Sequence, residues 1–214
     1  AGEAFDGMPY AEAVTKYLLS ICRDIHMPRK LKIAFCNGVD DCVHSAFRDM
    51  GFLAQEDGTF ALRIAGGLGA ARPSMGVLVE EHVSPKEVLY YAQAMVDTFC
   101  AHGNYENRAR ARTRYMQDTL GPDGLKEAFL KNVAVRKAEG GLALTGLEAP
   151  ADLDRRDGTI DHPRAIPQKQ DGLYAVEYHP IGGVLPADKP AKLYALLKDI
   201  PRAEVRVAPH ETIY

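Results

Sequence analysis

The chain has few cysteines, four in 214 residues, at Cys22, Cys36, Cys42 and Cys100. They are too scattered for the disulfide framework of a small secreted domain, so we expect free, buried thiols. Cys36 and Cys42 have five residues between them, which fits no common zinc pattern, and two thiolates cannot hold a cubane iron–sulfur cluster. The sequence therefore predicts no metal ligands here, with a cluster held by all four cysteines as an alternative.

Long apolar runs and an excess of positive charge are also absent. No stretch approaches the roughly 18 consecutive apolar residues of a membrane span. The opening "AGEAFDGMPY" lacks the pattern of a secretory signal. The formal net charge of -3 excludes a generally basic protein that coats nucleic acid. We therefore expect a cytoplasmic protein with no membrane partner, in which any anion site comes from local clustering of charge.

Familiar catalytic patterns are missing as well, because the histidines show no ligand spacing and no serine sits in a nucleophile elbow. The chain opens on Ala1 and stops in an apparent strand, "EVRVAPHETIY", so we expect a piece of a longer protein. What is present is an ordinary globular composition, 46% hydrophobic and 26% charged. This composition and length allow one large domain or two small ones.

Periodicity predicts a chain of mixed helices and strands. The clearest helix is 84–103, where Ser84 is a natural N-cap and Glu87 completes a capping box. The clearest hairpin is 52–67, because it contains the strong turn dipeptide Asp-Gly. We also expect strands at 30–36, 173–180 and 203–209, and helices at 40–51, 106–119, 122–134 and 189–200.

The composition changes after about residue 135, where Gly, Pro and charged residues become frequent without steady periodicity. We therefore expect a first domain over residues 1–135 and a linker over 136–165. A strand, a helix and a strand follow within residues 166–214, which suggests half of a ferredoxin-like split βαβ unit. The predicted fold class is α+β.

The stretch "HMPRKLKIAF", residues 26–35, puts Lys30 and Lys32 two apart in an expected strand. Residues i and i+2 point to the same face, so the two ammonium groups project together while Leu31 and Ile33 face the core. Unpaired ammonium groups on a buried strand are costly, so either carboxylates neutralise them or they lie at a water-filled or ligand-filled surface. Two interpretations stay open: a solvated edge strand with charges as gatekeepers, and an anion site.

A glycine-rich loop, "GGLGAARPSMG" at residues 66–76, follows an expected strand. Its backbone N–H groups could cradle phosphates or carboxylates. The loop lacks the third glycine of a dinucleotide fingerprint, so a turn-rich loop without a ligand is the alternative.

The densest positive run is "NRARARTRY", residues 107–115. In a helix, Arg108 and Arg112 would share one face, while Arg110 and Arg114 would lie nearly opposite. This argues against a single stripe that tracks phosphates. The run is either a solvated helix or a helix with one face serving a ligand.

Taken together, "MPRKLKIAF", "DDCVHSAFRDMGFLA", "GTFALRIAGGLG" and "HGNYENRARARTRY" resemble the middle of siroheme-dependent nitrite and sulfite reductases, which are built as a two-fold pseudo-repeat. Downstream, "IPQKQDGLYAVEYHPIGGVL" and "AEVRVAPHETIY" resemble the ferredoxin-like segment that begins the second repeat. The resemblance covers nearly the whole chain. It implies a siroheme-reductase α/β domain over 1–135 followed by a truncated ferredoxin-like segment.

The resemblance also implies roles for individual residues. Lys30 and Lys32 match the lysines that face the siroheme, bind the anionic substrate and help supply protons as its oxygens leave as water. Arg29 would serve packing or cofactor carboxylates, and Tyr105 replaces a common arginine. The other matching cofactor-binding positions are Gly66, Gly67 and Gly69 near the macrocycle, and Arg108 and Arg112 near the carboxylates of siroheme.

Siroheme and a 4Fe-4S cluster are the cofactors that the resemblance implies for the full-length enzyme. The family holds its cluster with paired cysteines of the second repeat, so this piece alone is expected to bind neither and to be inactive. Its partners would be nitrite or sulfite as substrate and an electron donor protein or subunit, with no nucleic acid. The alternative is a non-catalytic interaction or nucleic-acid-binding module that uses the arginine helix and the ferredoxin-like end.

Overall fold

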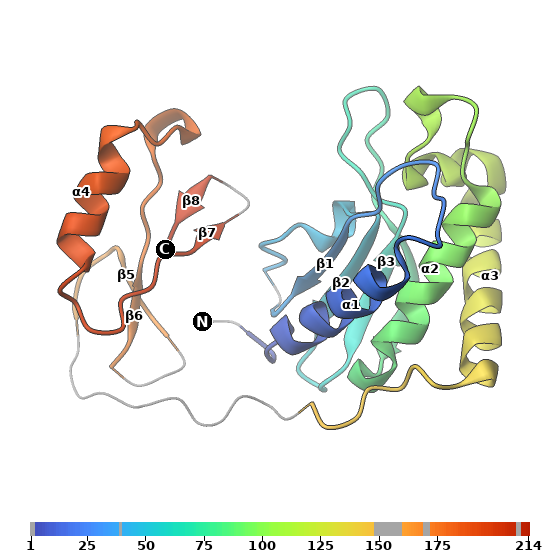
Figure 1. The fold of residues 1–214 in the computed structure, drawn as a ribbon, viewed down its shortest axis with the longest axis horizontal. Coiled ribbons are helices and arrows are strands. Elements are labelled where there is room, and N and C mark those ends of the chain that lie inside the picture. The colour runs from blue at the N-terminus through green and yellow to red at the C-terminus, as the bar shows by residue number, and fades with distance from the viewer. Residues whose placement is uncertain (1–2, 39, 148–159, 169–171, 209–210) are drawn as a thin grey trace. The chain divides into compact units, whose positions relative to one another are not determined.

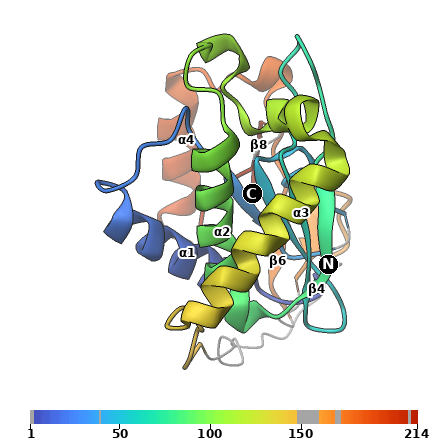
Figure 2. The ribbon, with the colours of Figure 1, turned by 90° about the vertical axis from the view of Figure 1, so that its right-hand side faces the viewer.

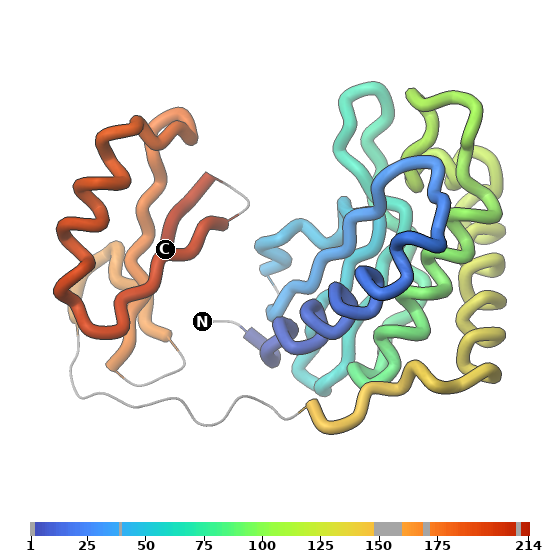
Figure 3. The backbone as a smooth tube through the Cα atoms, viewed as in Figure 1, coloured from blue at the N-terminus to red at the C-terminus, as the bar shows by residue number. Residues whose placement is uncertain are grey.

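A computed structural model describes residues 3–38, 40–147, 160–168, 172–208 and 211–214. The chain divides into two compact units, Gly2–Ala149 and Pro150–Tyr214, the latter grouped with Ala1. Figures 1 and 3 trace the backbone through both units from blue to red. Helices and strands occur in each, which confirms the α+β class. The domain limits at 135 and 166 stay a prediction, and residues 148–159 of the predicted linker lie outside the described residues.

The larger unit is a sheet covered on one face by helices. Its helices are α1 (Met8–Ile21), α2 (Val88–His102) and α3 (Met116–Glu139), with 3-10 turns η1 (Ser45–Phe47), η2 (Pro85–Glu87), η3 (Arg108–Arg110) and η4 (Thr113–Tyr115). Its strands are β1 (Ile33–Cys36), β2 (Met50–Ala54), β3 (Phe60–Ile64) and β4 (Val77–Val83). The sheet order is β1-β2-β3-β4, with β1 parallel to β2 and the remaining pairs antiparallel. Figure 2 shows α2 and α3 crossing in front of this sheet, with α1 beside α2.

The core lies between the helices and the sheet face that they cover. Strand β3 alternates, so that Phe60, Leu62 and Ile64 are fully buried while the residues between them are partly exposed. The neighbouring strands present aromatic rings to the same layer, and the rings of Phe35 and Phe52 stack with centroids 4.5 Å apart. Burying each such side chain contributes roughly 1.5–3 kcal/mol. This layer fixes β1, and with it the segment that precedes β1.

The expected hairpin over 52–67 is confirmed as β2 and β3, which pair antiparallel across a turn at Gly58 with a positive φ of 81°. The expected helix over 84–103 is confirmed as η2 and α2. Its predicted capping box is wrong, because the Ser84 side chain makes no capping hydrogen bond. Instead the carbonyl of Ser84 accepts from the N–H of Glu87 at 2.9 Å, which tightens the first turn into a 3-10 helix.

The expected helix over 40–51 is wrong. Asp41 and His44 have left-handed backbones with φ of 41° and 53°, and only the short turn η1 forms between them and β2. The carboxylate of Asp41 accepts from the N–H groups of Ser45 at 2.7 Å and Ala46 at 3.2 Å. Residues from Met50 onward pair with β1 and β3, and this pairing outweighs the local helical pattern.

The expected helix over 106–119 is wrong in its first part. Residues 108–115 form the separate turns η3 and η4, and α3 begins at Met116. Within α3 the backbone breaks at Gly121, with φ 69° and ψ 163°, directly before Pro122. The break falls where the predicted helices 106–119 and 122–134 were separated.

The smaller unit contains β5 (Ala165–Pro167), β6 (Tyr174–Val176), η5 (Ile181–Gly183), α4 (Asp188–Leu197), β7 (Val207–Ala208) and β8 (Thr212–Ile213). Strands β5 and β6 pair antiparallel, as do β7 and β8. The expected order of strand, helix and strand is present as β6, α4 and β7, and the last residue of the predicted strand 203–209 lies outside the described residues. Across the part of the chain that the structure describes, no helix has the length and apolar character of a membrane span.

Candidate functional site

The predicted strand 30–36 is wrong in its first part, because β1 begins at Ile33; the two lysines lie directly before it, and both are exposed. Leu31 and Ile33 pack against the core, so the alternation predicted for this segment is present. Among the described residues, no carboxylate forms an ion pair with Lys30 or Lys32. The segment therefore presents two neighbouring positive charges to solvent at the edge of the sheet. Its edge position also suits the gatekeeper interpretation.

Asp49 is a buried carboxylate beneath this segment, and its side chain is 0% exposed. Its Oδ2 accepts from the backbone N–H of Lys32 at 2.9 Å and from Nη2 of Arg112 at 2.6 Å. Its Oδ1 accepts from the hydroxyl of Thr113. A buried charge is tolerated only when it is paired and hydrogen-bonded, and here both conditions are met. Asp49 thus ties the lysine segment to the arginine-rich segment.

The glycine loop is joined to the same point. The carbonyl of Asp49 accepts from the N–H of Ala65 at 2.7 Å, and the carbonyl of Arg48 accepts from the N–H of Gly66 at 2.8 Å. Ala65 is fully buried and has a left-handed φ of 60°, which turns the chain sharply out of β3. The lysine segment, the glycine loop and the arginine-rich segment therefore meet around residues 48 and 49.

The glycine loop closes over a buried arginine. Gly67 and Ser74 exchange backbone hydrogen bonds of 2.9 Å in both directions, which holds the base of the loop. A Cβ at Gly67 would lie 3.2 Å from the side chain of Arg114, and one at Gly69 would collide with its guanidinium. The absence of a side chain at both glycines thus allows the loop to lie close against Arg114.

Arg114 is 9% exposed and makes no ion pair with any described residue. Its guanidinium carbon lies 4.9 Å from the ring centroid of Tyr115, and its Nε has no hydrogen-bond partner. The Nε of Arg112 is also buried and without a partner. Leaving such donors unsatisfied costs about 1–3 kcal/mol or more each. Because Arg112 is paired with Asp49, Arg114 is the arginine of this pair whose positive charge no described carboxylate balances.

The remaining predicted arginines have different surroundings. Arg29 donates from Nη1 to the carbonyl of Arg108 at 2.9 Å, so it fixes the turn η3 against the lysine segment. The shared helix face expected for Arg108 and Arg112 is wrong, because residues 108–115 form two turns. Arg110 pairs with Asp118 at 3.4 Å. With its arginines used in this way, the run offers no continuous basic face, and nothing supports the nucleic-acid-binding alternative.

Sequence reasoning did not identify Asp49, and it placed Arg114 on the face opposite to the ligand. A weak signal existed for Asp49, because it lies within "DDCVHSAFRDMGFLA" directly before an apolar strand. Nothing local indicates its partners, since Arg112 lies 63 positions further along the chain. For Arg114 the misassignment follows from the helix predicted there.

The expectation of buried thiols is wrong for Cys22 and Cys42, which are exposed, whereas Cys36 is buried. The spacing of Cys36 and Cys42 nevertheless brings their Sγ atoms to 3.9 Å, and Cys36 is the last residue of β1. Among the described residues, no group of three or more His, Cys, Asp or Glu side chains could hold a metal ion.

Mild oxidation of the purified full-length protein with diamide is expected to join Cys36 and Cys42, because their thiols are already in contact. Partial desolvation of the Cys42 thiol beside the protein surface, and next the neighbouring Cys36, raise its pKa, so the reaction should be slow near neutral pH and faster in alkaline buffer. Peptide mapping would detect the disulfide, with Cys22 and Cys100 as internal controls. Full alkylation of both Cys36 and Cys42 after oxidation would contradict this prediction.

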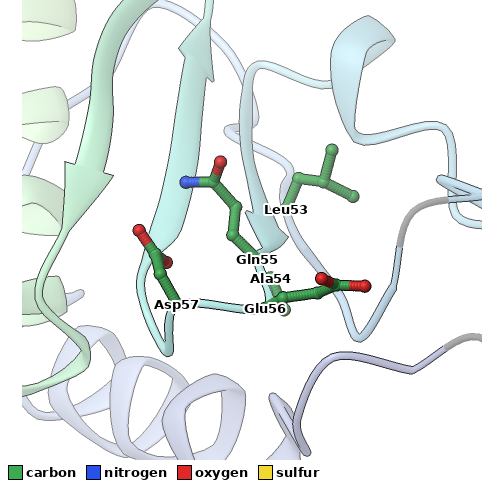
Figure 4. A pocket seen from close by; sticks show the side chains of 5 residues that line it. All are labelled: Leu53, Ala54, Gln55, Glu56 and Asp57. Carbon is green, nitrogen blue, oxygen red and sulfur yellow. The ribbon is translucent and has the colours of Figure 1, made fainter.

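A hollow of about 430 Å³ lies at the turn between β2 and β3, lined by Leu53, Ala54, Gln55, Glu56 and Asp57. Figure 4 shows the side chains of Gln55 and Asp57 directed away from that of Glu56. The carboxylate of Asp57 contacts Nδ1 of His82 on β4 at 2.8 Å, so it links the turn between β2 and β3 to β4. The hollow lies at the C-terminal end of β2, whereas Asp49 lies directly before the first residue of β2. None of the predicted site residues lines the hollow.

Comparisons with known proteins find relatives among nitrite and sulfite reductases. Ferredoxin–nitrite reductase of Zea mays is 26% identical over 220 residues, which cover 99% of this chain and 37% of that protein. The sulfite reductase [NADPH] hemoprotein beta-component of Acidithiobacillus ferrooxidans is 32% identical over 111 residues, covering 48% of this chain and 20% of that protein.

A solved structure shares the fold. The Mycobacterium tuberculosis NirA protein superposes with a TM-score of 0.71 at 23% identity, over 99% of this chain and 37% of that one. The chain therefore spans well under half the length of the proteins it is similar to. The sequence profile described as the nitrite and sulphite reductase 4Fe-4S domain matches residues 1–137. This chain belongs to the nitrite and sulphite reductase 4Fe-4S domain family.

Proposed function

We propose that this chain is the part of a siroheme-dependent nitrite or sulfite reductase that carries the lysine half of its substrate site. One observation carries the proposal: Lys30 and Lys32 stand exposed and without ion-pair partners among the described residues, on a segment that Asp49 holds against Arg112. Nitrite and sulfite are the two candidate substrates, because the Zea mays relative is named as a nitrite reductase and the Acidithiobacillus ferrooxidans relative as a sulfite reductase component.

The lysine pair suits both anions. Two neighbouring ammonium groups attract a small oxyanion, and they stabilise negative charge that develops on its oxygens as the N–O or S–O bond breaks. Each ammonium also holds protons at Nζ that can pass to a departing oxygen, which then leaves as water. Within the part of the chain that the structure describes, neither ammonium group makes a hydrogen bond or ion pair that would have to be broken first. We therefore assign Lys30 and Lys32 the binding and protonation of the substrate.

The largely buried guanidinium groups of Arg112 and Arg114 suit a cofactor that carries carboxylates. Arg112 and Arg114 each have an unsatisfied Nε, and the loop at Gly67 and Gly69 closes against Arg114. We propose that Arg112 and Arg114, with the exposed Arg108, hold the carboxylates of siroheme, whose iron supplies the redox chemistry when it is bound. Gly66 contributes by shaping the start of the loop.

The rest of the enzyme would come from the remainder of the full-length protein. A 4Fe-4S cluster would be held by cysteines of that remainder. An electron donor such as a ferredoxin or an NADPH-linked subunit, as the names of the relatives indicate, would dock there. This piece alone is expected to be inactive. A cytoplasmic location stays a prediction, because the plant relatives are named as chloroplastic.

The direct test expresses the full-length gene that encodes this chain and purifies the protein. We expect a siroheme absorption spectrum and reduction of nitrite or sulfite with reduced methyl viologen as the electron source. Comparing the turnover of the two anions identifies the preferred substrate. A colourless protein that reduces neither anion after cofactor loading would overturn the proposal.

A further inference from the structure

We propose that Asp49 is a positioning residue of the anion site, which holds Lys32 and Arg112 in register through one carboxylate oxygen. The proposal rests on the proposed function, because it assumes that Lys32 meets the substrate. Asp49 itself is 1% exposed, so its side chain is closed off from solvent. Its effect on the reaction would pass entirely through the groups that it binds.

The backbone of Lys32 depends on Asp49 because it lies just outside the sheet. Strand β1 begins at Ile33, so the N–H of Lys32 donates to the Asp49 side chain at 2.9 Å instead of to a neighbouring strand. The carbonyl of Lys32 accepts from the N–H of Met50 at 3.1 Å, which is the residue after Asp49. Both polar backbone groups of Lys32 are thus held by residues 49 and 50, while its side chain is exposed.

The same oxygen, Oδ2, also accepts from Nη2 of Arg112 at 2.6 Å. Charge-assisted bonds of this kind are short and strong, so the carboxylate fixes the distance between the Lys32 peptide and the Arg112 guanidinium. The Thr113 hydroxyl on Oδ1 prevents the carboxylate from rotating about its own axis. Without an acceptor at this place, the Lys32 peptide would lose its partner, and Arg112 would lose its counter-charge in a largely buried setting.

Two substitutions of Asp49 distinguish the effect of its hydrogen-bond acceptor from the effect of its negative charge. In Asp49→Asn the amide oxygen can take the place of Oδ2 and accept from Lys32 and Arg112, while the amide N–H₂ donates to the Thr113 oxygen. In Asp49→Ala the acceptor is gone. If Asp49 acts by position, Asn should therefore rescue most of the function that Ala loses.

The experiment measures siroheme content, melting temperature, kcat, and the Kd of nitrite and sulfite from the visible spectrum of the full-length protein. For Asp49→Ala we expect at least about a tenfold rise in anion Kd and fall in kcat/KM in the siroheme-loaded fraction, since small misplacements of a reacting group have effects of this size or more. Asp49→Asn should stay within about threefold of the parent. A merely structural role would lower the melting temperature and leave the Kd of the loaded fraction unchanged.

Matched variants complete the design. Thr98→Val on α2 removes another fully buried hydrogen-bonding group, which accepts from Asn132 at 2.9 Å, and should lower stability without changing anion Kd. If Asp49→Ala does not fold, Thr113→Val decides the question, because it removes one donor and should raise the anion Kd in the same direction. An unchanged Kd in Thr113→Val would then overturn the proposal, as would equal losses in Asp49→Asn and Asp49→Ala.

Lys32→Met distinguishes a failure of the positioning role of Asp49 from a failure of the proposed function. If Lys32→Met abolishes turnover and Asp49→Ala does not affect it, the positioning role is wrong and the proposed function stands. If Lys32→Met leaves turnover unchanged, the assignment of the substrate site itself is wrong.

Discussion

Replacing Lys30 or Lys32 by Met in the full-length protein is expected to lower kcat/KM for the anion by about 10²- to 10⁴-fold, the range typical of lost proton transfer and charge stabilisation. Both side chains are exposed and make no ion pair among the described residues, so melting temperature and siroheme content should stay near those of the parent. Steady-state assays with reduced methyl viologen, together with the visible spectrum, measure both properties.

Lys131→Met is the matched control, because Lys131 is an exposed lysine on α3 and carries no assigned role. It should leave turnover unchanged. The gatekeeper interpretation of the lysine pair makes the opposite prediction for Lys30→Met and Lys32→Met, namely normal turnover together with a greater tendency to aggregate through the edge strand β1. Normal turnover in both lysine variants would remove them from the substrate site.

The elements that could be predicted from the sequence are those whose signals are local. The hairpin of β2 and β3 is specified by its turn, and the glycine at position 58 has the positive φ of 81° that the dipeptide implies. Helix α2 is marked by its apolar pattern and is followed by Gly103, whose N–H donates to the carbonyl of Phe99 at 2.9 Å. Each of these features can be seen within about 20 residues of chain, without knowledge of what packs against it.

The elements that were missed or wrong depend on partners distant in sequence. Residues 40–51 have a helical pattern, but the last two of them belong to β2, which pairs with β1 on one side and β3 on the other. Strand β4 was not predicted, and its register shifts against β3, so its alternation is irregular. Tertiary pairing outweighs local propensity in such segments.

The site shows the same division. The alternation of Lys30 and Lys32 with core residues could be predicted from spacing, and their assignment to an anionic substrate came from resemblance. The contacts of Asp49 with Lys32 and Arg112 join positions 17 and 63 residues away from it, and no short motif encodes such distances. Sequence reasoning therefore identified the exposed lysines and missed the buried carboxylate that binds the backbone of Lys32.

In the glycine loop, Gly66→Ala is expected to destabilise the protein by about 1–3 kcal/mol, because the added methyl group meets a filled space. A Cβ at Gly66 would lie 2.6 Å from the Ala46 carbonyl oxygen and 2.9 Å from both the Arg48 carbonyl oxygen and the Phe47 Cα. All of these are backbone atoms, so no side chain can rotate to make room. Thermal unfolding of the full-length protein measures the loss.

Gly69→Ala should behave differently, because its Cβ would meet the end of the Arg114 side chain, which can rotate away. We expect a stability loss of no more than about 1 kcal/mol, accompanied by weaker retention of siroheme as the guanidinium moves. Gly124→Ala is the control, since its Cβ has ordinary contact with Leu120 at 3.7 Å within α3, and alanine there should raise stability by about 0.5–1 kcal/mol. An unchanged melting temperature in Gly66→Ala would contradict the packing role of Gly66. Full retention of siroheme in Gly69→Ala would contradict the link from Gly69 through Arg114 to the cofactor.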